Sequence, residues 1–498
     1  MRECLALAWR SRLPLAAALA LVLARSLVFL WWEQPRFNSD QAIVGLMASH
    51  LAEGRAFPVF FYGQGYMLGV QAWLAAPVFL VLGPSVFALT LPLVAVNLAV
   101  AALLIVLLQR ELGLGPWTAL AASLFVVLAP PATAALLLEP NGGSVEPLLY
   151  VLLIWMLRRR PAALGLVLGL GVLHREFTIY GLAALLVLRA QERRPITKAS
   201  LRHAATVAAW FAIAWIGVQG LRAVSSPFGP GTSVWDAATP DTHAHEVAAR
   251  VCWAGPVLPA RLWSLATRHL GLLFGTTPQS LGRLGIRSWA AGQGLPWLGT
   301  LFALALAAAV ARGAWVGWRQ PSSRRHVSFA AYLLLVGLAS MGGYAAFSCE
   351  RITAATMRYG LLGLLAGVAV AAWYLRLEPS KAARAAALAV LLAWGGVSAR
   401  SHAQLLREYL FSPPPNGARE AVETLVADGF RYGRAPYWVA YRLTFLAGER
   451  FVLATDPPVR IRAYQRRPPE ATGPVEWIRS SPCDGGRRLA EGFYRCPR

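Results

Sequence analysis

The residues best suited to chemistry lie in one polar segment that interrupts the apolar N-terminal part of the chain. Asp40 follows Asn38 and Ser39, either of which can cap a helix, and apolar residues then recur at helical spacing until Gly54. A carboxylate beside an apolar surface is able to act as a general base toward a hydroxyl group. The first turn of a helix also favours any acid, by about 0.3–1 kcal/mol through the helix dipole. For Asp40 taken alone, both interpretations stay open.

An aromatic and glycine-rich strip follows this predicted helix, over residues 57–66. Its sequence is FPVFFYGQGY, in which Tyr62, Gln64 and Tyr66 combine a flat ring or an amide with hydrogen-bonding atoms. Because a sugar ring has apolar faces and hydroxyl edges, aromatic rings and amides beside a carboxylate suit a sugar. We therefore predict that these three residues, together with Gln41, bind a substrate next to Asp40.

Two further segments carry ionisable residues among apolar stretches. Glu139 precedes Pro140 and two glycines, a sequence typical of a tight turn that brings backbone close to a ligand, although an ordinary exposed acid explains it as well. His174 and Arg175 separate two short apolar stretches, where each charge is costly by about 2.5–3.5 kcal/mol. An ion pair of Arg175 with Glu176 is one explanation. We favour a phosphate-binding pair of His174 and Arg175, since an arginine fork matches phosphate geometry.

The composition indicates what kind of protein must position these residues. Of the 498 residues, 57% are hydrophobic and the mean hydropathy is +0.49. Only 14% are charged, against about 25% in soluble proteins, which excludes a soluble enzyme and a disordered chain. The net charge of +23 comes largely from arginines clustered in short connectors, as the positive-inside rule predicts for cytoplasmic loops. The charge therefore predicts a membrane topology and no nucleic-acid partner.

Apolar stretches predict a mainly α-helical, polytopic membrane bundle with about eleven spans. They cover residues 13–30, 85–108, 116–130, 147–157, 161–174, 177–190, 204–220, 295–311, 327–346, 358–376 and 382–399. Residues 66–82 are apolar as well, but counting them as a crossing would move the arginines at 158–160 to the outer side. We therefore expect 66–82 to lie along the membrane surface, the N-terminus to be cytoplasmic and the C-terminus to lie outside.

The spans divide the chain into a membrane domain, residues 1–400, and a small soluble domain, residues 401–498. The membrane domain carries outer loops at 31–84, 130–147 and 221–294. The last 98 residues hold 25 charged side chains, against 46 in the preceding 400, and their mixed strand and helix patterns predict an α/β-like extracytoplasmic domain. Cys483 and Cys496 predict a disulfide there, whereas for Cys252 and Cys349 a disulfide and buried free thiols are equally open. No metal site is predicted, and the histidines at 243 and 245 are taken as loop residues.

Two segments resemble a known family. Residues 38–83, with an S-D-Q-A start, E-G-R and F-F-Y-G-Q-G-Y, resemble the first outer loop of bacterial membrane glycosyltransferases of the GT-C superfamily, near the protein O-mannosyltransferases and lipid A aminoarabinose transferases. Residues 435–445, APYWVAYRLTF, resemble the outer domain often fused to that membrane core. The resemblance implies a bacterial inner-membrane enzyme with a polyprenyl-phosphate-linked sugar donor, a lipid, glycan or protein acceptor on the outer face, and inversion at the anomeric carbon. A divalent cation is the one cofactor that it leaves open.

The resemblance also implies roles for single residues. The acid of the first outer loop, here Asp40, does the acid–base work, and Glu139 stands where relatives often place a second acid. Many relatives have Glu directly after the first acid, whereas here Gln41 can hydrogen-bond a hydroxyl but cannot take a proton. Arg358 and Tyr359 resemble an arginine–tyrosine element of the family, which makes Arg358 a second phosphate candidate. An interfacial anchor explains this pair equally well.

We therefore predict an integral-membrane glycosyltransferase that transfers a hexosyl or pentosyl group, with Asp40 as the general base. A lipid-linked sugar flippase is the first alternative. It would predict acids in paired, broken spans related by an internal repeat, whereas the sequence shows no repeat and its acids lie in outer loops. A catalytically inactive membrane scaffold is the second alternative, kept open by Gln41.

Overall fold

The computed structural model describes residues 2–34, 36–191, 197–224, 247–248, 251–275, 324–349, 351–352, 355–466 and 475–497. Its first half consists of helices α1 (Arg2–Trp31), α2 (Ser39–Ala52), α3 (Val70–Leu82), α4 (Val86–Leu112), α5 (Pro116–Val127), α6 (Pro131–Leu137), α7 (Glu146–Leu157), α8 (Pro161–His174), η1 (Glu176–Thr178), α9 (Ile179–Gln191) and α10 (Lys198–Val224). Its second half begins with η2 (Gly255–Val257), α12 (Leu258–Ser264), η3 (Leu265–His269), α13 (Leu270–Leu273), α16 (Arg324–Phe347), η5 (Ala355–Gly363), α17 (Leu364–Leu377) and α18 (Lys381–Phe411).

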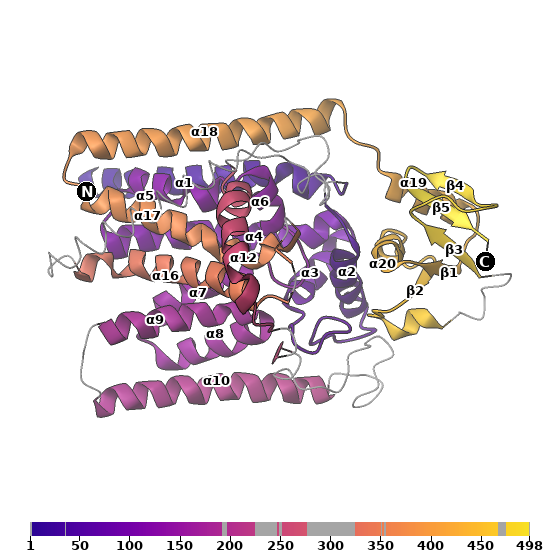
Figure 1. The fold of residues 1–498 in the computed structure, drawn as a ribbon, viewed down its shortest axis with the longest axis horizontal. Coiled ribbons are helices and arrows are strands. Elements are labelled where there is room, and N and C mark those ends of the chain that lie inside the picture. The colour runs from indigo at the N-terminus through magenta and orange to yellow at the C-terminus, as the bar shows by residue number, and fades with distance from the viewer. Residues whose placement is uncertain are drawn as a thin grey trace.

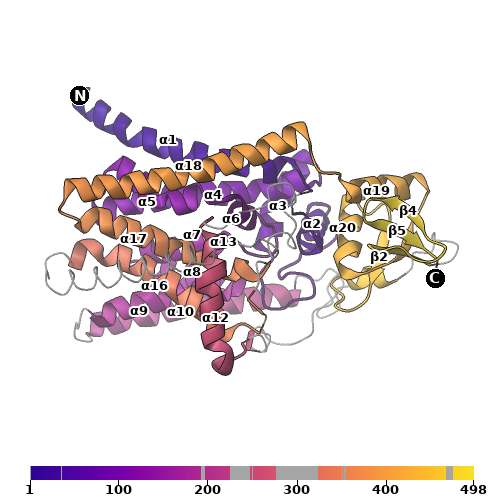
Figure 2. The same ribbon diagram turned by 45° about the horizontal axis from the view of Figure 1, so that its top comes forward.

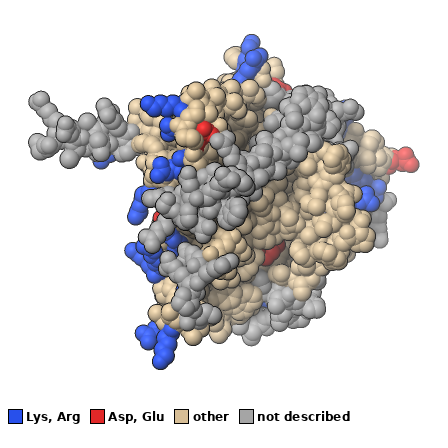
Figure 3. All heavy atoms as spheres, turned by 60° about the vertical axis from the view of Figure 1, so that its left-hand side comes forward, with Lys and Arg blue, Asp and Glu red and all other residues tan. Residues whose placement is uncertain are grey.

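The long helices form a bundle with two chemically different ends. In Figures 1 and 2 these helices run side by side, and the C-terminal sheet lies at one end, with α2 and α3 between the sheet and the bundle. The N-terminus and the connection from α17 to α18 lie at the opposite end (Figure 1). Figure 3 brings this opposite end forward and shows lysine and arginine side chains along it. The basic connectors and the C-terminal sheet are thus separated by the length of the bundle.

Several helices are long and apolar enough to cross a membrane. Within the described residues these are Arg12–Trp31, Val86–Leu112, Lys198–Arg222, Ser328–Phe347, Thr356–Leu377 and Lys381–Phe411, and the bent pair α5–α6 adds a seventh. The chain is therefore a multi-pass membrane protein. The expected count of eleven depends further on short apolar helices such as α7 and α8. It also depends on residues 295–311, which lie outside the described residues. The histidines at 243 and 245, taken as loop residues from the sequence, lie outside the described residues as well.

The expected span 116–130 is broken by prolines. Helices α5 and α6 meet at an angle of 81° around Pro130 and Pro131. Proline has no backbone N–H and clashes with the preceding turn, so the helix cannot continue through this pair. Ser398 and His402 of α18 hydrogen-bond two carbonyl oxygens at the break, at 2.7 and 2.8 Å. Neighbouring helices thereby satisfy backbone groups that the membrane interior cannot.

The C-terminal part is a small α/β unit, as the sequence predicts. It consists of α19 (Gly417–Ala427), β1 (Tyr432–Ala435), α20 (Tyr437–Leu446), β2 (Val452–Thr455), η6 (Arg462–Gln465), β3 (Glu476–Arg479), β4 (Arg487–Ala490) and β5 (Phe493–Cys496). The sheet order is β2-β1-β3-β5-β4, with β1 parallel to both neighbours and the other pairs antiparallel. The expected boundary at residue 400 falls inside α18, because that helix continues to Phe411.

The α/β unit and the first outer loop share one hydrophobic core. Phe445 of α20 packs against Phe37 and Phe79, with ring centroids 5.5 and 6.3 Å apart. Gly45 of α2 faces the same ring so closely that a β-carbon would clash with it. Helix α2 is therefore held between α3 and α20 rather than exposed as a loop element.

Two disulfides stabilise segments at this end of the molecule. Cys483 and Cys496 are bonded within the α/β unit, which confirms the prediction. Cys252 and Cys349 are bonded to each other as well, which decides between the two alternatives left open by the sequence.

Candidate functional site

Asp40 lies in the first turn of α2, as predicted, because the Asn38 side chain caps this helix by accepting a hydrogen bond from the Gln41 backbone N–H at 3.2 Å. Its side chain is 18% exposed. The Tyr437 hydroxyl donates a hydrogen bond of 2.6 Å to Oδ1, and Nη1 of Arg358 lies 3.9 Å from Oδ2. The carboxylate is thus open at one side and flanked by a phenol and a guanidinium group.

Arg358 and Tyr359 lie beside Asp40, so the structure brings this predicted pair to the predicted carboxylate. Arg358 Nη2 donates to the Tyr359 hydroxyl at 3.2 Å, and the guanidinium lies 5.2 Å from the centre of that ring. The same guanidinium interacts electrostatically with Glu139. Its Nε atom is buried and has no hydrogen-bond partner among the described residues. This arrangement leaves cationic donor capacity next to Asp40.

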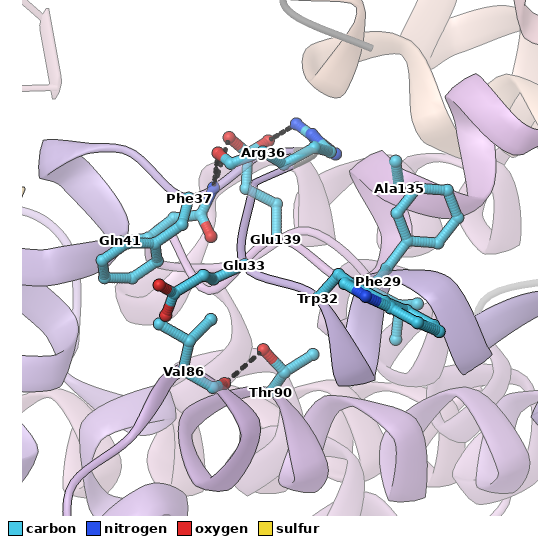
Figure 4. Close-up of a pocket in the computed structure, with 11 residues that line it drawn as sticks. Phe29, Trp32, Glu33, Arg36, Phe37, Gln41, Val86, Thr90, Ala135 and Glu139 are labelled. Atoms are coloured by element: carbon cyan, nitrogen blue, oxygen red, sulfur yellow. Dashed lines mark hydrogen bonds and ion pairs between the residues drawn. The ribbon is translucent and has the colours of Figure 1, made fainter. Parts of the chain in front are cut away.

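Glu139 forms a buried ion pair that holds the start of α2. Its Oε2 accepts a hydrogen bond of 2.6 Å from Arg36, and its Oε1 accepts from the side chains of Asn38 and Gln41, both at 3.3 Å. Figure 4 shows Arg36, Gln41 and Glu139 converging at the rim of a cavity of about 20 Å3, which is room for one water molecule. Burial lowers the pKa of Arg36, and the charge of Glu139 opposes that effect. With three donors on a 3% exposed carboxylate, the geometry suits positioning better than proton transfer.

The loop after Glu139 forms a second group of donors around His174 and Arg175. Gly142 and Gly143 have φ values of +91° and +124°, which residues other than glycine rarely adopt. This turn places the backbone of Gly143 against the side chains of His174 and Arg175. Arg175 Nη2 donates to the Asn141 carbonyl at 3.3 Å, and the His174 ring lies 2.8 Å from the hydroxyl of a tyrosine on α7. Arg175 Nε and Asn141 Nδ2 are buried without a partner among the described residues. The predicted phosphate-binding pair therefore lies behind the Glu139 loop, fully inside the protein.

The aromatic strip is placed differently from the expectation of a sugar platform. Tyr62 and Tyr66 are only 2% and 7% exposed and pack into the core shared with the α/β unit. The Tyr62 hydroxyl lies 3.0 Å from Nδ1 of His50. His50 follows Asp40 by ten residues in α2, which corresponds to about 15 Å along the helix axis, so Tyr62 lies away from Asp40. Gln64 is 9% exposed. These rings are buried because the α/β unit covers the strip, a long-range contact that local sequence does not reveal.

Two residues that the sequence did not single out complete the surroundings of Asp40. Tyr437 begins α20, directly after Pro436, and Arg460 lies in the loop that follows β2. Arg460 Nη1 donates to the Gly63 carbonyl at 2.8 Å, and its Nε donates to the Tyr437 hydroxyl at 3.4 Å. Tyr437 falls in the second segment of family resemblance, but nothing in the sequence pairs position 437 with position 40.

The donor set at Asp40 does not fit a divalent cation. Among the described residues, Tyr437 occupies Oδ1 of Asp40 and the Arg358 guanidinium lies 3.9 Å from Oδ2, so a divalent cation on this carboxylate would lie beside a positive charge. Within the part of the chain that the structure describes, no group of three or more His, Cys, Asp or Glu side chains could hold a metal ion.

Comparison with known proteins identifies the fold. No protein-family model and no curated protein matches the sequence. The structure matches the oligosaccharyltransferase of Archaeoglobus fulgidus in its apo form with a TM-score of 0.50 at 13% identity, over 90% of this chain and 65% of the archaeal one. This chain thus spans about two thirds of the length of that enzyme.

ArnT from Cupriavidus metallidurans is also similar. In the form bound to undecaprenyl phosphate, the TM-score is 0.43 at 12% identity, with 91% of this chain and 87% of ArnT covered. In the apo state, the TM-score is 0.39 at 14% identity, with 88% and 85% covered. The likeness to the archaeal enzyme shows that this chain shares the fold of that oligosaccharyltransferase.

Proposed function

We propose that the protein is an integral-membrane glycosyltransferase that transfers a sugar from a polyprenyl-phosphate donor to an acceptor hydroxyl, with inversion. The observation that carries this proposal is the position of Asp40, a partly exposed carboxylate with the Arg358 guanidinium 3.9 Å away, at the end of a membrane bundle. The GT-C fold supports the same reaction class. A general base beside a fixed cation is what this transfer needs, because one group must take a proton and the other must stabilise a departing phosphate.

The proposed reaction is a single displacement. The Asp40 carboxylate takes the proton of the acceptor hydroxyl while the acceptor oxygen forms a bond to C1 of the sugar. The bond between C1 and the phosphate oxygen breaks, and the electron pair stays on the polyprenyl phosphate. Arg358 stabilises the charge of that leaving group, and attack opposite to it inverts the anomeric carbon.

Other residues have supporting roles in this proposal. Glu139, predicted as a second acid, fixes the start of α2 through Arg36 and Gln41. The buried donors of His174 and Arg175 form a second anion-binding group behind the loop and stabilise the bound phosphate from the protein interior. The Asp40 oxygens need no metal ion to act in this way.

The orientation in the membrane is part of the proposal. The bundle end with the basic connectors faces the cytoplasm, and the end with Asp40 and the α/β unit faces outward. In a bacterial inner membrane, a lipid-linked donor then keeps its chain in the bilayer while its sugar reaches Asp40. A reporter enzyme that is active only outside the cytoplasm, fused after the α/β unit, should be active. An inactive fusion at a normal protein level would refute the orientation.

The function is tested by sugar transfer in membranes supplied with radiolabelled polyprenyl-phosphate sugars. We compare the wild type with Asp40→Asn and with the control Asp456→Asn, an acid on the α/β unit that is 57% exposed. Loss of the base should lower transfer by about 10²–10⁴-fold at a normal protein level, while the control stays at the wild-type rate. Equal transfer by Asp40→Asn would remove Asp40 as the base. No transfer by the wild type from any donor would refute the enzyme and favour a flippase or a scaffold.

A further inference from the structure

Side chains of the α/β unit hold α2 at both of its ends. At the N-terminal end, the Tyr437 hydroxyl donates to Asp40, and the Ser39 hydroxyl donates to the Tyr437 carbonyl at 2.7 Å. At the C-terminal end, His50 is fully buried and its Nε2 lies 3.2 Å from Oε1 of Glu449. The two attachments flank the hydrophobic contact of α2 with α20 described above. The helix that carries Asp40 is therefore fixed by residues almost 400 positions away in the chain.

The Tyr437 phenol is itself fixed by contacts on its other side. Its hydroxyl accepts from Arg460 Nε at 3.4 Å, and Arg460 is tied to the Gly63 carbonyl. The Tyr437 ring also packs edge-on against Tyr441, at 5.4 Å between centroids. A phenol has one hydrogen to donate. With Arg460 as the donor on one side, that hydrogen points to Asp40.

We propose that Tyr437 is a positioning residue for Asp40, so that the α/β unit completes the catalytic centre instead of being a separate outer domain. This inference rests on the proposed function. The hydrogen bond of Tyr437 engages Oδ1 and fixes the plane of the carboxylate, which leaves Oδ2, on the Arg358 side, to take the acceptor proton. A carboxylate rotated out of this plane no longer presents Oδ2 to the acceptor hydroxyl.

The protonation state of the Tyr437 phenol fits its role as a hydrogen-bond donor to Asp40. Burial and the negative charge of Asp40 raise the pKa of Tyr437 well above its usual value, while Arg460 opposes the shift. The groups that face the phenol are Asp40 from α2, Arg460 from the loop after β2 and Tyr441 from α20, with Arg358 beyond Asp40. Tyr437 therefore stays protonated and remains a donor across the range in which an enzyme works.

The first test compares Tyr437→Phe with Tyr494→Phe, the same change on β5 of the same α/β unit. Tyr437→Phe should lower kcat by about 10–100-fold with KM for the donor within about threefold of the wild type, since only the alignment of the base changes. Tyr494→Phe should leave both constants unchanged. An unchanged kcat in Tyr437→Phe would overturn the proposal, and so would a loss that appears only as a lower amount of folded protein.

A second measurement needs no transfer activity, so it separates this inference from the proposed function. 3-Fluorotyrosine placed at position 437 is titrated by ¹⁹F NMR in the purified protein, with and without Asp40→Asn. The pKa of the fluorinated phenol should fall when the neighbouring carboxylate charge is removed. The same pKa in both proteins would overturn the contact even if transfer is observed. A shift in a protein that transfers no sugar would retain the contact and refute only the reaction.

Discussion

The ion pair of Arg36 with Glu139 allows a sharp test of whether Glu139 positions the site or reacts in it. We consider the single variants Glu139→Gln and Arg36→Met and the double variant. Glutamine keeps an oxygen for the amides of Asn38 and Gln41 while it removes the charge. Glu139→Gln removes the negative charge that faces the buried Arg36 guanidinium. Arg36→Met removes the positive charge bonded to the buried carboxylate, which then interacts only with the guanidinium of Arg358 among the cations named above. The double variant contains neither charge.

The structure sets the expected magnitude. The two charged groups are 2.6 Å apart, and their side chains are only 8% and 2% exposed. At an effective dielectric constant of about 20, two unit charges at this distance attract by about 6 kcal/mol, and the loss of water around both ions offsets a large part of that attraction. Removing one partner of such a pair destabilises a protein by about 3–5 kcal/mol, whereas removing both is close to neutral. Two single losses of about 3–5 kcal/mol each and a nearly neutral double variant correspond to a coupling energy of about 6–10 kcal/mol between the two positions.

The assay is the free energy of unfolding of the purified protein in mixed detergent and SDS micelles, measured for all four members of the cycle. Additive losses in the double variant would refute the view that this pair is a buried, mutually dependent contact. Sugar transfer per folded molecule is measured in parallel. Glu139→Gln should keep transfer within about tenfold of the wild type, because the reacting carboxylate is unchanged. A loss as large as that of Asp40→Asn, in a stable protein, would instead make Glu139 an acid of the reaction.

Three further changes have defined outcomes. Asn97→Leu should destabilise the bundle by about 1.5–3 kcal/mol in SDS unfolding, because Asn97 Oδ1 accepts the 2.6 Å hydrogen bond of Arg25, a guanidinium only 1% exposed inside the membrane region. Gly143→Ala should lower the unfolding temperature, with a cost of about 1–3 kcal/mol, since φ is +124° and the added carbon would lie 2.6 Å from Cγ of Arg175. Burial alone would raise the pKa of Glu449, but hydrogen bonds from neighbouring histidine and arginine side chains lower it to about 2. Its contribution, about 3 kcal/mol at 1.36 kcal/mol per pH unit, is present above pH 4.5 and lost as the pH falls toward 2. Glu449→Gln should flatten the dependence of stability on pH in that window, and unchanged slopes would refute this assignment.

Some features of the site follow from neighbours in the sequence. Asn38 caps α2 and places Asp40 in its first turn, as the spacing predicts, because capping and helical periodicity involve residues within one or two turns. The disulfide of Cys483 with Cys496 follows in the same way from two cysteines within one short unit. By contrast, the sequence predicts an unbroken span that ends at Pro130, whereas the structure shows a bend before Pro131 at which side chains of α18 hydrogen-bond the backbone.

The sequence by itself determined that the chain is a polytopic helical membrane protein, that residues after its last long helix form an α/β unit, and that Asp40 lies in the first turn of a helix. Composition and local periodicity are enough for these conclusions, because burial in lipid and helix capping act on each segment separately. Only the tertiary structure decided that Tyr437 contacts Asp40 and that Tyr62 and Tyr66 are buried. The contact of Tyr437 with Asp40 joins positions 397 residues apart, and it forms because α2, α3 and α20 bury their apolar faces in one shared core.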